Sequence, residues 1–465
     1  MQRRTAALHV ACAGGYLAFL DTTIVNTSFP DIAASFPEAG RAELSWVLDG
    51  YFIVLAALLV PAGALADRFG RKRLFLAGVT AFVLTSVACG LAPSWEALVA
   101  ARVLQGAAAA VVAPVSLALV LPEFGVERRA TGVGLWGAAA ALAAATGPPL
   151  GGLLVEVADW RWIFLVNVPL GAVLLWAGGR VLRESRDETA TGLPDLAGAA
   201  LSAAALGLLA LGIVEGEAWG WASAGVLASF AGAGVLLAAV ARRCLHHPRP
   251  VVSPELFADR AFRRGNAGML LFGAAFFSTI LGNILFLTSV WGYSVLDAGL
   301  ATVPGPLVTA IVAGPAGRLA DRFGHRAVIV PGTVIYAAGL LVLRSAGAEP
   351  DYVGTWLPGM VLAGVGIGLA FPTFGSAAVA GVAPDRFGAA SAVSSAFRQI
   401  GAVLGTAILV AIVGEPQSLA EALARADDAY LFAVVASLAS GAVALTLAPR
   451  RMAAPAAAAA EPAPA

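Results

Sequence analysis

Apolar runs of about 20 residues recur along the whole chain, and this repetition constrains the fold more than any single motif does. A run of that length crosses the ~30 Å hydrocarbon core of a bilayer as an α-helix, which satisfies its own backbone hydrogen bonds there. Only 12% of the 465 residues are charged, too few to cover the surface of a soluble protein of this size. The sequence therefore predicts an all-α membrane protein that crosses the bilayer many times.

The apolar windows predict 14 transmembrane helices, followed by a low-complexity tail at 451–465 that we expect to be disordered. We expect the first run to be an uncleaved span rather than a signal peptide, because it continues past Asp21 without a convincing cleavage box. The predicted spans lie near residues 7–29, 45–66, 74–92, 97–121, 131–155, 162–179, 196–214, 222–241, 266–290, 298–317, 327–343, 354–380, 387–413 and 429–448.

The basic residues support this count. With the N-terminus in the cytoplasm, the cytoplasmic segments hold 23 of the 29 Lys and Arg residues, while the external loops hold four and the spans two. Lysine and arginine are enriched on the cytoplasmic side of membrane proteins, and shifting the count by one span would destroy the asymmetry. We therefore expect both termini in the cytoplasm.

Composition also excludes several classes of function. The formal net charge is zero, so no basic field attracts nucleic acid, and no Walker or dinucleotide fingerprint is present. The three cysteines lie far apart and the histidines have no metal-ligand neighbours in sequence, which indicates neither a disulfide framework nor a metal site. We expect no cofactor, no metal and no enzyme activity.

An internal repeat divides the chain into two parallel six-span halves. Four matches occur in the same order, which is hard to obtain by chance, and such repeats place a substrate site near the midplane between the halves. At offsets of 254 to 258 residues, the matches pair GALADRFGRKR (63–73) with GRLADRFGHRA (317–327), GPPLG (147–151) with GAVLG (401–405), RVLQG (102–106) with MVLAG (360–364), and DTTIVN (21–26) with STILGN (278–283).

The repeat offset is longer than six spans require, and the spans at 196–214 and 222–241 account for the excess. We therefore expect two six-helix bundles plus two inserted helices. The predicted boundaries are an N-terminal six-helix bundle at 1–190, an inserted transmembrane pair at 191–245 and a C-terminal six-helix bundle at 246–450.

The repeated loop GALADRFGRKR resembles the signature G-x-x-x-D-R-x-G-R-[KR] of the major facilitator superfamily. With 14 spans, the remaining motifs resemble its drug:proton antiporter family, over about residues 10–410. LDTTIVNTSFP (20–30) resembles the first-span pattern L-D-x-T-[IV]-V-N-x-A-x-P, with Ser28 in place of the usual alanine. RVLQG resembles the fourth-span motif, GPPLGG (147–152) the fifth-span antiporter motif, and WRWIFLVNVPLG (160–171) the entry to the sixth span.

The resemblance implies a cytoplasmic gate. Asp67 should meet the N-terminus of the span near Gly388, where the helix dipole favours a carboxylate, and Asp321 should by symmetry meet the N-terminus near Ala130. Alternatively, these charges only determine topology. The predicted gate residues are Gly63, Asp67, Arg68, Gly70, Arg71, Asp321 and Arg322.

The prolines of GPPLGG remove backbone donors and should bend the fifth span, while its glycines permit close helix approach. The bend could be a packing kink alone, but the resemblance implies that it biases the carrier toward export. The residues involved are Gly147, Pro148, Pro149, Gly151 and Gly152.

Two charges of the N-terminal half have no counterpart in the repeat. Asp21 aligns with Ser278, and Arg102 aligns with Met360. A charge inside a span usually marks a transport pathway or has a buried partner, although Arg102 could instead snorkel to the outer surface. The resemblance implicates Arg102 in proton transfer. We expect Asp21 and Arg102 to face one cavity and to share proton coupling.

Other polar residues of the spans complete the candidate cavity. Asp49 could be satisfied by interfacial water instead, and Arg398 could be a structural pairing. Glu215 and Glu217 are expected to be solvated outside the membrane. Beyond Asp21 and Arg102, the cavity candidates are Thr22, Thr23, Asn26, Asp49, Gln105, Asn283 and Arg398.

The resemblance predicts a proton-coupled exporter of small amphipathic drugs or antibiotics, working by alternating access as a monomer in a bacterial inner membrane. A proton-coupled importer on the same fold is one alternative, against which GPPLGG and the inserted pair argue. A non-transporting receptor or assembly factor is the other. The substrate itself cannot be read from the sequence.

Overall fold

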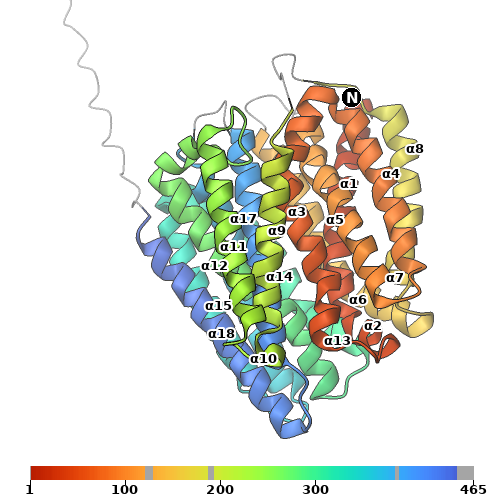
Figure 1. The fold of residues 1–465 in the computed structure, drawn as a ribbon, viewed down its shortest axis with the longest axis vertical. Helices are drawn as coiled ribbons and strands as arrows, with labels where there is room; N and C mark the ends of the chain where they lie inside the picture. The colour runs from red at the N-terminus through yellow and green to blue at the C-terminus, as the bar shows by residue number, and fades with distance from the viewer. Residues whose placement is uncertain (1, 121–128, 187–192, 383–386, 448–465) are drawn as a thin grey trace, which may run out of the picture.

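The computed structural model describes residues 2–120, 129–186, 193–382 and 387–447, and all regular secondary structure in these ranges is helical (Figure 1). Thirteen helical segments there are long and apolar enough to cross a membrane. A shorter apolar helix at Leu142–Val157 belongs to α6 (Arg129–Val157) and supplies the remaining predicted span. The all-α membrane fold is therefore confirmed, while the predicted tail at 451–465 lies outside the described residues.

The spans correspond in order to the predicted apolar windows. Three of them consist of two helical pieces: α7 (Trp162–Leu165) with α8 (Asn167–Val181), α13 (Val295–Thr302) with α14 (Pro304–Phe323), and η4 (Tyr352–Trp356) with α16 (Leu357–Val379). Short helices outside the spans are α2 (Phe29–Ser35), α10 (Gly216–Trp219) and η3 (Pro254–Ala258). The other spans are α1 (Gln2–Thr27), α3 (Arg41–Phe69), α4 (Arg71–Gly90), α5 (Trp95–Val120), α9 (Leu196–Val214), α11 (Ala224–His246), α12 (Arg260–Ser289), α15 (His325–Arg344), α17 (Phe387–Val413) and α18 (Leu419–Leu445).

The helices pack as two groups that meet along one seam. In the first group α1 packs on α5, α6 and α8, and α5 also packs on α3 and α4. In the second group α12 packs on α16, α17 and α18, and α15 packs on α16 and α18. The seam is formed mainly by α3 against α17 and by α6 against α13. The two groups correspond to the two predicted six-helix bundles, whose exact boundaries remain a prediction.

The inserted pair lies against the seam rather than beside one bundle. Helix α9 contacts both α3 and α17, and α11 packs on α9 (yellow-green in Figure 1). Where α9 begins and α11 ends, Asp195 caps α9 and accepts hydrogen bonds from Arg243 Nε of α11 at 2.7 and 2.9 Å.

The expectation that both glutamates of the inserted pair are solvated is wrong for Glu215. Glu215 is only 8% exposed, and burial together with the nearby Glu43 carboxylate raises the pKa of Glu215. Glu217 instead forms an ion pair with Arg425 of α18 at 3.0 Å. The short connection α10 is therefore tied to the C-terminal bundle.

The repeat is visible in the backbone where α3 meets α4 and where α14 meets α15. Gly70 and Gly324 separate these helices with φ values of 109° and 89°. Side chains with a Cβ rarely adopt this left-handed region, so glycine is required at both turns. The equivalent glycines of the two repeated loops thus make equivalent turns.

The two bundles close against each other at the end of the molecule where α2 and α13 lie (lower part of Figure 1). A Cβ built on Gly152 of α6 would lie 2.5 Å from the Leu296 Cα of α13, and one on Gly299 would lie 2.5 Å from the Pro148 carbonyl oxygen. Near the same end, Arg41 Nη1 donates to the Gly414 carbonyl at 2.9 Å. Contacts this close leave no space for a solute between α6 and α13.

Candidate functional site

An ion pair is buried inside the N-terminal bundle, between α1 and α5. Arg102 Nη1 donates to Asp21 Oδ2 at 2.6 Å, and the two side chains are 1% and 0% exposed. The packing of α1 on α5 brings these residues together from positions 81 apart in sequence. The contact that the unmatched charges predict is therefore present, and the alternative in which Arg102 snorkels to the surface does not describe this conformation.

Two amides complete the coordination of the Asp21 carboxylate. Gln105 Nε2 donates to Asp21 Oδ1 at 3.0 Å, and Asn167 Nδ2 donates to the same oxygen at 3.2 Å. Both amides also donate to Ser86 Oγ of α4, at 2.8 and 3.3 Å. The carboxylate thus accepts hydrogen bonds from two helices besides α1, in a site closed to solvent.

The Arg102 guanidinium is equally well surrounded. Its Nε donates to the Val47 carbonyl oxygen at 3.0 Å, and its Nη1 also donates to Gln105 Oε1 at 2.7 Å. The guanidinium carbon lies 4.1 Å from the centre of the Tyr51 ring, an arrangement that stabilises a cation. A buried charge is tolerated when a partner of opposite charge compensates it, and Asp21 is that partner here.

The contacts of this pair depend on the charge of the Asp21 carboxylate. A proton on Asp21 would remove the negative charge that Arg102 faces and would place an additional donor among groups that already donate. The pair would then have to separate or repack, because an uncompensated buried arginine is strongly unfavourable. The hydrogen bonds of Asp21 to Arg102, Gln105 and Asn167 thus tie α1 to α5 and α8.

The polar neighbours of Asp21 on α1 bond mainly to the backbone. Thr22 Oγ1 donates to the Ala18 carbonyl at 3.1 Å, and Asn26 Nδ2 donates to the Thr22 carbonyl at 2.7 Å. Thr23 Oγ1 shares its proton among the Phe19, Leu20 and Ala143 carbonyls. The structure leaves only Thr23 half-exposed, so Asp21, Thr22 and Asn26 do not line an open cavity in this conformation.

The C-terminal bundle replaces the ion pair by neutral contacts. Asn283, the repeat counterpart of Asn26, accepts a hydrogen bond from Tyr430 Oη at 2.9 Å. Its Nδ2 lies 3.7 Å from the sulfur of Met360, which is the repeat counterpart of Arg102. Nearby, Thr279 Oγ1 and Tyr336 Oη are 2.6 Å apart. The unmatched charges are therefore a property of the N-terminal bundle alone.

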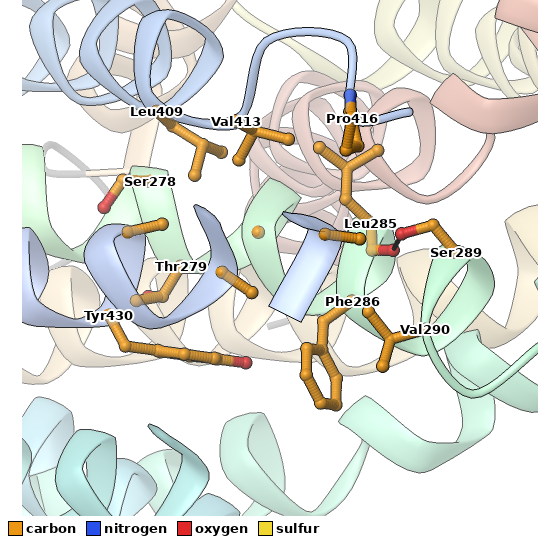
Figure 2. Close-up of a pocket in the computed structure, with 14 residues that line it drawn as sticks. Ser278, Thr279, Leu285, Phe286, Ser289, Val290, Leu409, Val413, Pro416 and Tyr430 are labelled. Carbon is orange, nitrogen blue, oxygen red and sulfur yellow. Dashed lines mark hydrogen bonds between the residues drawn. The ribbon is translucent and has the colours of Figure 1, made fainter. Parts of the chain in front are cut away.

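A pocket in the C-terminal bundle lies between α12, α17 and α18 (Figure 2). Its walls are mostly apolar, and Ser278, Thr279 and Tyr430 contribute hydroxyl groups. Ser278 is the repeat counterpart of Asp21, so the position that carries a buried carboxylate in one bundle borders a hollow in the other. This pocket is separate from the Asp21–Arg102 pair.

Asp49 is buried more deeply than interfacial solvation allows, so that interpretation was wrong. Helix α3 already begins at Arg41, which places Asp49 two turns inside it at 0% exposure. Neither carboxylate oxygen has a hydrogen-bond partner among the described residues, and Ser45 one turn earlier donates its hydroxyl to the Ala42 carbonyl. A buried carboxylate without partners is unfavourable in its charged form, which makes Asp49 a candidate to carry a proton.

Arg398 lies near the middle of α17 and is half-buried. Its guanidinium carbon is 5.9 Å from the ring centre of Phe19 on α1, across the seam between the bundles. Among the described residues no carboxylate pairs with Arg398. The structural pairing considered for this residue is therefore not found in the described part of the chain.

The predicted gate loop is held mainly by contacts within the N-terminal bundle. Asp67 accepts hydrogen bonds from Arg71 Nε and Nη2 at 2.9 and 2.8 Å. Glu184, which follows α8, accepts from the backbone N–H groups of Lys72 and Arg73 at the start of α4. The side chains at the predicted partner positions 130 and 388 lie outside the described residues, so the gate contacts of Asp67 and Asp321 stay a prediction.

Among the described residues, the contacts of Arg68 and Arg322 are local to their own loops. The guanidinium of Arg68 lies over the Phe69 ring at 5.0 Å, and that of Arg322 lies over the Phe323 ring at 5.1 Å. Gly63 has open space where a Cβ would be. Both arginines thus repeat the same local contact in the two halves.

The glycines of GPPLGG bring α6 close to two other helices. A Cβ on Gly147 would lie 2.1 Å from Thr23 Oγ1, and one on Gly151 would lie 2.9 Å from Ile24 Cγ1, both on α1. Gly152 faces α13 of the other bundle, as described above. The motif therefore lies at the junction of α1, α6 and α13, while a bend at Pro148 and Pro149 stays a prediction.

Comparison with known proteins identifies the family. The chain matches the description of the Major Facilitator Superfamily over residues 11–406 and 267–465. It belongs to the Major Facilitator Superfamily. As a member of this superfamily the protein is a multi-pass membrane transporter of small molecules and not an enzyme.

Several relatives of this superfamily member act on drugs or antibiotics according to their names. The chain is 36% identical to multidrug resistance protein Stp of Mycobacterium tuberculosis over 401 residues, which is 86% of this chain and 74% of Stp. It is 35% identical to cephamycin export protein CmcT of Amycolatopsis lactamdurans over 441 residues, 94% of this chain and 90% of CmcT. It is 32% identical to the methylenomycin A resistance protein of Streptomyces coelicolor over 403 residues, covering 86% and 84% of the two chains.

A solved structure supports the superfamily fold. The crystal structure of the human organic anion transporter MFSD10 superimposes with a TM-score of 0.65 and covers 95% of this chain and 99% of its own. At 18% sequence identity, the likeness establishes the fold only. The predicted membership of a drug-efflux branch of the superfamily is confirmed by the relatives named above.

Three residues of the buried site were missed from sequence. Ser86 and Asn167 bond the Asp21 network, and Tyr51 lies under Arg102. Asn167 was detectable, because an amide in the apolar run of WIFLVNVPLG is rare inside a membrane span and usually has a function. Ser86 and Tyr51 carry no such signal, since serine and tyrosine are common in transmembrane helices.

Proposed function

We propose that this transporter exports small amphipathic compounds, drugs or antibiotics among them, across the cytoplasmic membrane in exchange for protons. The observation that carries the proposal is the buried Asp21–Arg102 pair, whose carboxylate is closed to solvent and bonded by three donors. The names of the relatives, which include an export protein and resistance proteins, support the direction of transport and the class of substrate.

Proton exchange at Asp21 would drive the conformational cycle. With Asp21 charged, Arg102 and the two amides hold α1, α5 and α8 together as the structure shows. Protonation weakens these contacts and lets α1 and α5 shift against each other. Protons entering the cell release about 2.3 kcal/mol per 100 mV for each charge, plus the contribution of any pH gradient, and this free energy drives export.

Alternating access would follow from rocking of the two bundles about their seam. The distribution of basic residues assigns the end with α2 and α13 to the outside and both termini to the cytoplasm. The close contacts of Gly152 and Gly299 then form the outer closure, so the conformation described here is closed to the outside. The GPPLGG bend and the gate loops around Asp67 and Asp321 would control the two closures.

Two further residues are assigned to the same cycle. Asp49 would carry a second proton, because its carboxylate lies buried without partners in the described chain. Asn283 would supply a neutral hydrogen-bonding group from the C-terminal bundle. We propose that the protein works as a monomer.

Inverted membrane vesicles from cells that produce this protein test the proposal. In inverted vesicles an exporter carries its substrate into the vesicle interior. An imposed proton gradient should therefore drive a compound to accumulate inside the vesicles. The compound is chosen from the resistance profile of a pump-deficient host that expresses this protein. Movement of solute in the opposite direction would favour the proton-coupled importer. A non-transporting receptor would show neither movement, and its activity would survive Asp21→Asn.

A further inference from the structure

Arg398 lies inside a membrane span, as Arg102 does, but the described residues offer it no carboxylate. Arg102 is paired with Asp21, Arg344 with Asp427 and Arg425 with Glu217. In the part of the chain that the structure describes, the guanidinium carbon of Arg398 lies 5.9 Å from the centre of the Phe19 ring and has no charged partner. An arginine at the middle of a membrane span is costly, and such residues generally face a partner or a water-filled pathway.

Two aromatic side chains form a corner beside this arginine. Phe19 and Trp136 meet edge to face, with ring centres 5.4 Å apart and planes at 71°. Trp136 Nε1 donates to Ser116 Oγ at 2.9 Å, which fixes the indole, and the ring lies directly over Gly15 of α1. The corner is therefore preorganised by α1, α5 and α6, while Arg398 approaches it from α17.

The corner is accessible from the N-terminal end of α1. One face of this helix carries His9 and Ala13, which are exposed, followed by Tyr16, Phe19 and Thr23, which are half-buried. These positions recur every three or four residues and so share one side of the helix. Exposure ends beyond them, since Thr27 and Phe29 are each only 1% exposed. The accessible face thus leads from the cytoplasmic end proposed above to Arg398 and stops there.

Other charges of the interior do not neutralise Arg398. Asp21 and Arg102 satisfy each other, and Asp49 is fully buried in α3. Of these charged side chains near the middle of the described spans, Arg398 is therefore the one that is partly exposed. An anionic group entering along α1 would find a guanidinium without a partner among the described residues, beside the Phe19 ring against which Trp136 packs.

We propose that Arg398, Phe19 and Trp136 recognise the negative charge and the ring of an anionic aromatic substrate. This inference rests on the proposed export function and adds the charge class of the compound. A carboxylate, sulfonate or phenolate would accept paired hydrogen bonds from the planar guanidinium. The attached ring would pack against Phe19 and Trp136 in the edge-to-face or offset geometry that aromatic groups prefer.

Binding of three matched probes to the purified full-length protein in lipid nanodiscs tests the proposal. The probes are 1-naphthoate, the neutral 1-naphthamide and the cationic 1-naphthylmethylammonium, measured by calorimetry. A hydrogen bond to a charged group is strong enough that 1-naphthoate should bind at least about tenfold more tightly than 1-naphthamide. The cation should bind more weakly than both. Equal binding of the three probes, preference for the cation, or no binding of 1-naphthoate would overturn the proposal.

Variants of the protein test which side chain causes the preference for the anionic probe. Arg398→Gln should abolish the preference for 1-naphthoate over 1-naphthamide, and Arg398→Lys should retain part of it, since lysine keeps the charge without the planar fork. Phe19→Leu should weaken the binding of both probes alike. Arg180→Gln is the matched control, because Arg180 also lies over a ring, that of Trp176 at 4.5 Å, but on the exposed surface of α8. An unchanged preference in Arg398→Gln would contradict the assignment.

The test separates this inference from the export function. Probe selectivity of the unmodified protein needs no variant to fold and no proton gradient. Anion-selective binding without proton-driven transport would contradict the export proposal alone. Proton-driven export of neutral or cationic compounds by a protein that binds 1-naphthoate no more tightly than 1-naphthamide would contradict the charge class alone.

Discussion

At the scale of single residues, the Asp21–Arg102 pair differs from the other described ion pairs because both of its side chains are buried. In each of the others at least one side chain is 35% exposed or more. Exposed pairs contribute little to stability, whereas breaking a buried pair leaves a charge that nothing compensates. The two classes of pair should therefore respond very differently to mutation.

A double-mutant cycle on the pair makes this measurable. Asp21→Asn or Arg102→Met alone should lower the free energy of unfolding by about 3–5 kcal/mol, because one buried charge remains. The double variant should lose less than the sum, since methionine already occupies the equivalent position, Met360, in the other half. Chemical denaturation in mixed micelles measures all four proteins. Strict additivity would mean that the two side chains do not interact.

Asp49 should behave in the opposite way. Its carboxylate has no described partner to lose, so Asp49→Asn should leave the thermal unfolding temperature unchanged or raise it. The same variant should transport fewer protons per exported molecule if Asp49 carries one. Proton flux and solute flux measured together in proteoliposomes test this, with Asp49→Glu as the variant that keeps a titratable group. A marked loss of stability in Asp49→Asn would mean that the charged Asp49 carboxylate has a stabilising partner in the native protein, which would contradict this prediction.

At the scale of helices, glycine sets how closely α6 approaches its neighbours. Gly152→Ala would place a Cβ 2.5 Å from the Leu296 backbone, so α6 and α13 would have to separate. Overpacking of this kind costs about 1–3 kcal/mol. We expect Gly152→Ala to lower the thermal stability and to make transport leaky. Gly179→Ala in α8, where a Cβ meets nothing within 4 Å, is the control and should be neutral or stabilising.

The two inserted helices are joined by the ion pair between Asp195, at the start of α9, and Arg243, near the end of α11. Although burial opposes the charge, the Gly198 N–H and the Arg243 guanidinium lower the pKa of Asp195 below its ordinary value of 3.8. A lowered pKa stabilises the fold above pH 3.8, and that contribution disappears as the pH falls through the folded-state pKa. Asp195→Asn should keep the helix cap but lose the ion pair, at a cost of about 1–3 kcal/mol.

The pH profile distinguishes this ion pair from mere packing. The stability difference between the unmodified protein and Asp195→Asn should stay constant from neutral pH down to about pH 5 and shrink below pH 4. Unfolding temperatures recorded across this range provide the comparison. A difference that persists unchanged at pH 3 would exclude the carboxylate charge as its cause.

At the scale of the whole molecule, hydrophobic periodicity and the repeat were enough to predict the fold. Each apolar window became a helix, and the contact of Asp21 with Arg102 followed from two charges that lack counterparts at Ser278 and Met360. These features are local or symmetric in sequence, which is why they could be predicted. The helix ends were predicted less well: the predicted span began four residues after the start of α3, which left open the alternative that interfacial water satisfies Asp49.

Contacts between distant helices could not be predicted in the same way. Nothing in the sequence places Ser86 of α4 between the amides of Gln105 and Asn167, because that depends on how three helices rotate about their axes. The position of α9 across the seam of α3 and α17 was equally inaccessible, since an apolar helix packs on many surfaces. The surroundings of Arg398 could not be predicted for the same reason, and the structure places the Phe19 ring of α1 beside it.

The central claim is that Asp21 couples proton movement to export. Its most direct test is transport by proteoliposomes containing the unmodified protein or Asp21→Asn, with a compound chosen from the resistance profile. Both proteins should exchange labelled for unlabelled compound in the absence of a gradient, which shows that the variant folds and binds. Only the unmodified protein should accumulate the compound against its gradient when a pH gradient is imposed. Equal accumulation by Asp21→Asn would contradict the claim.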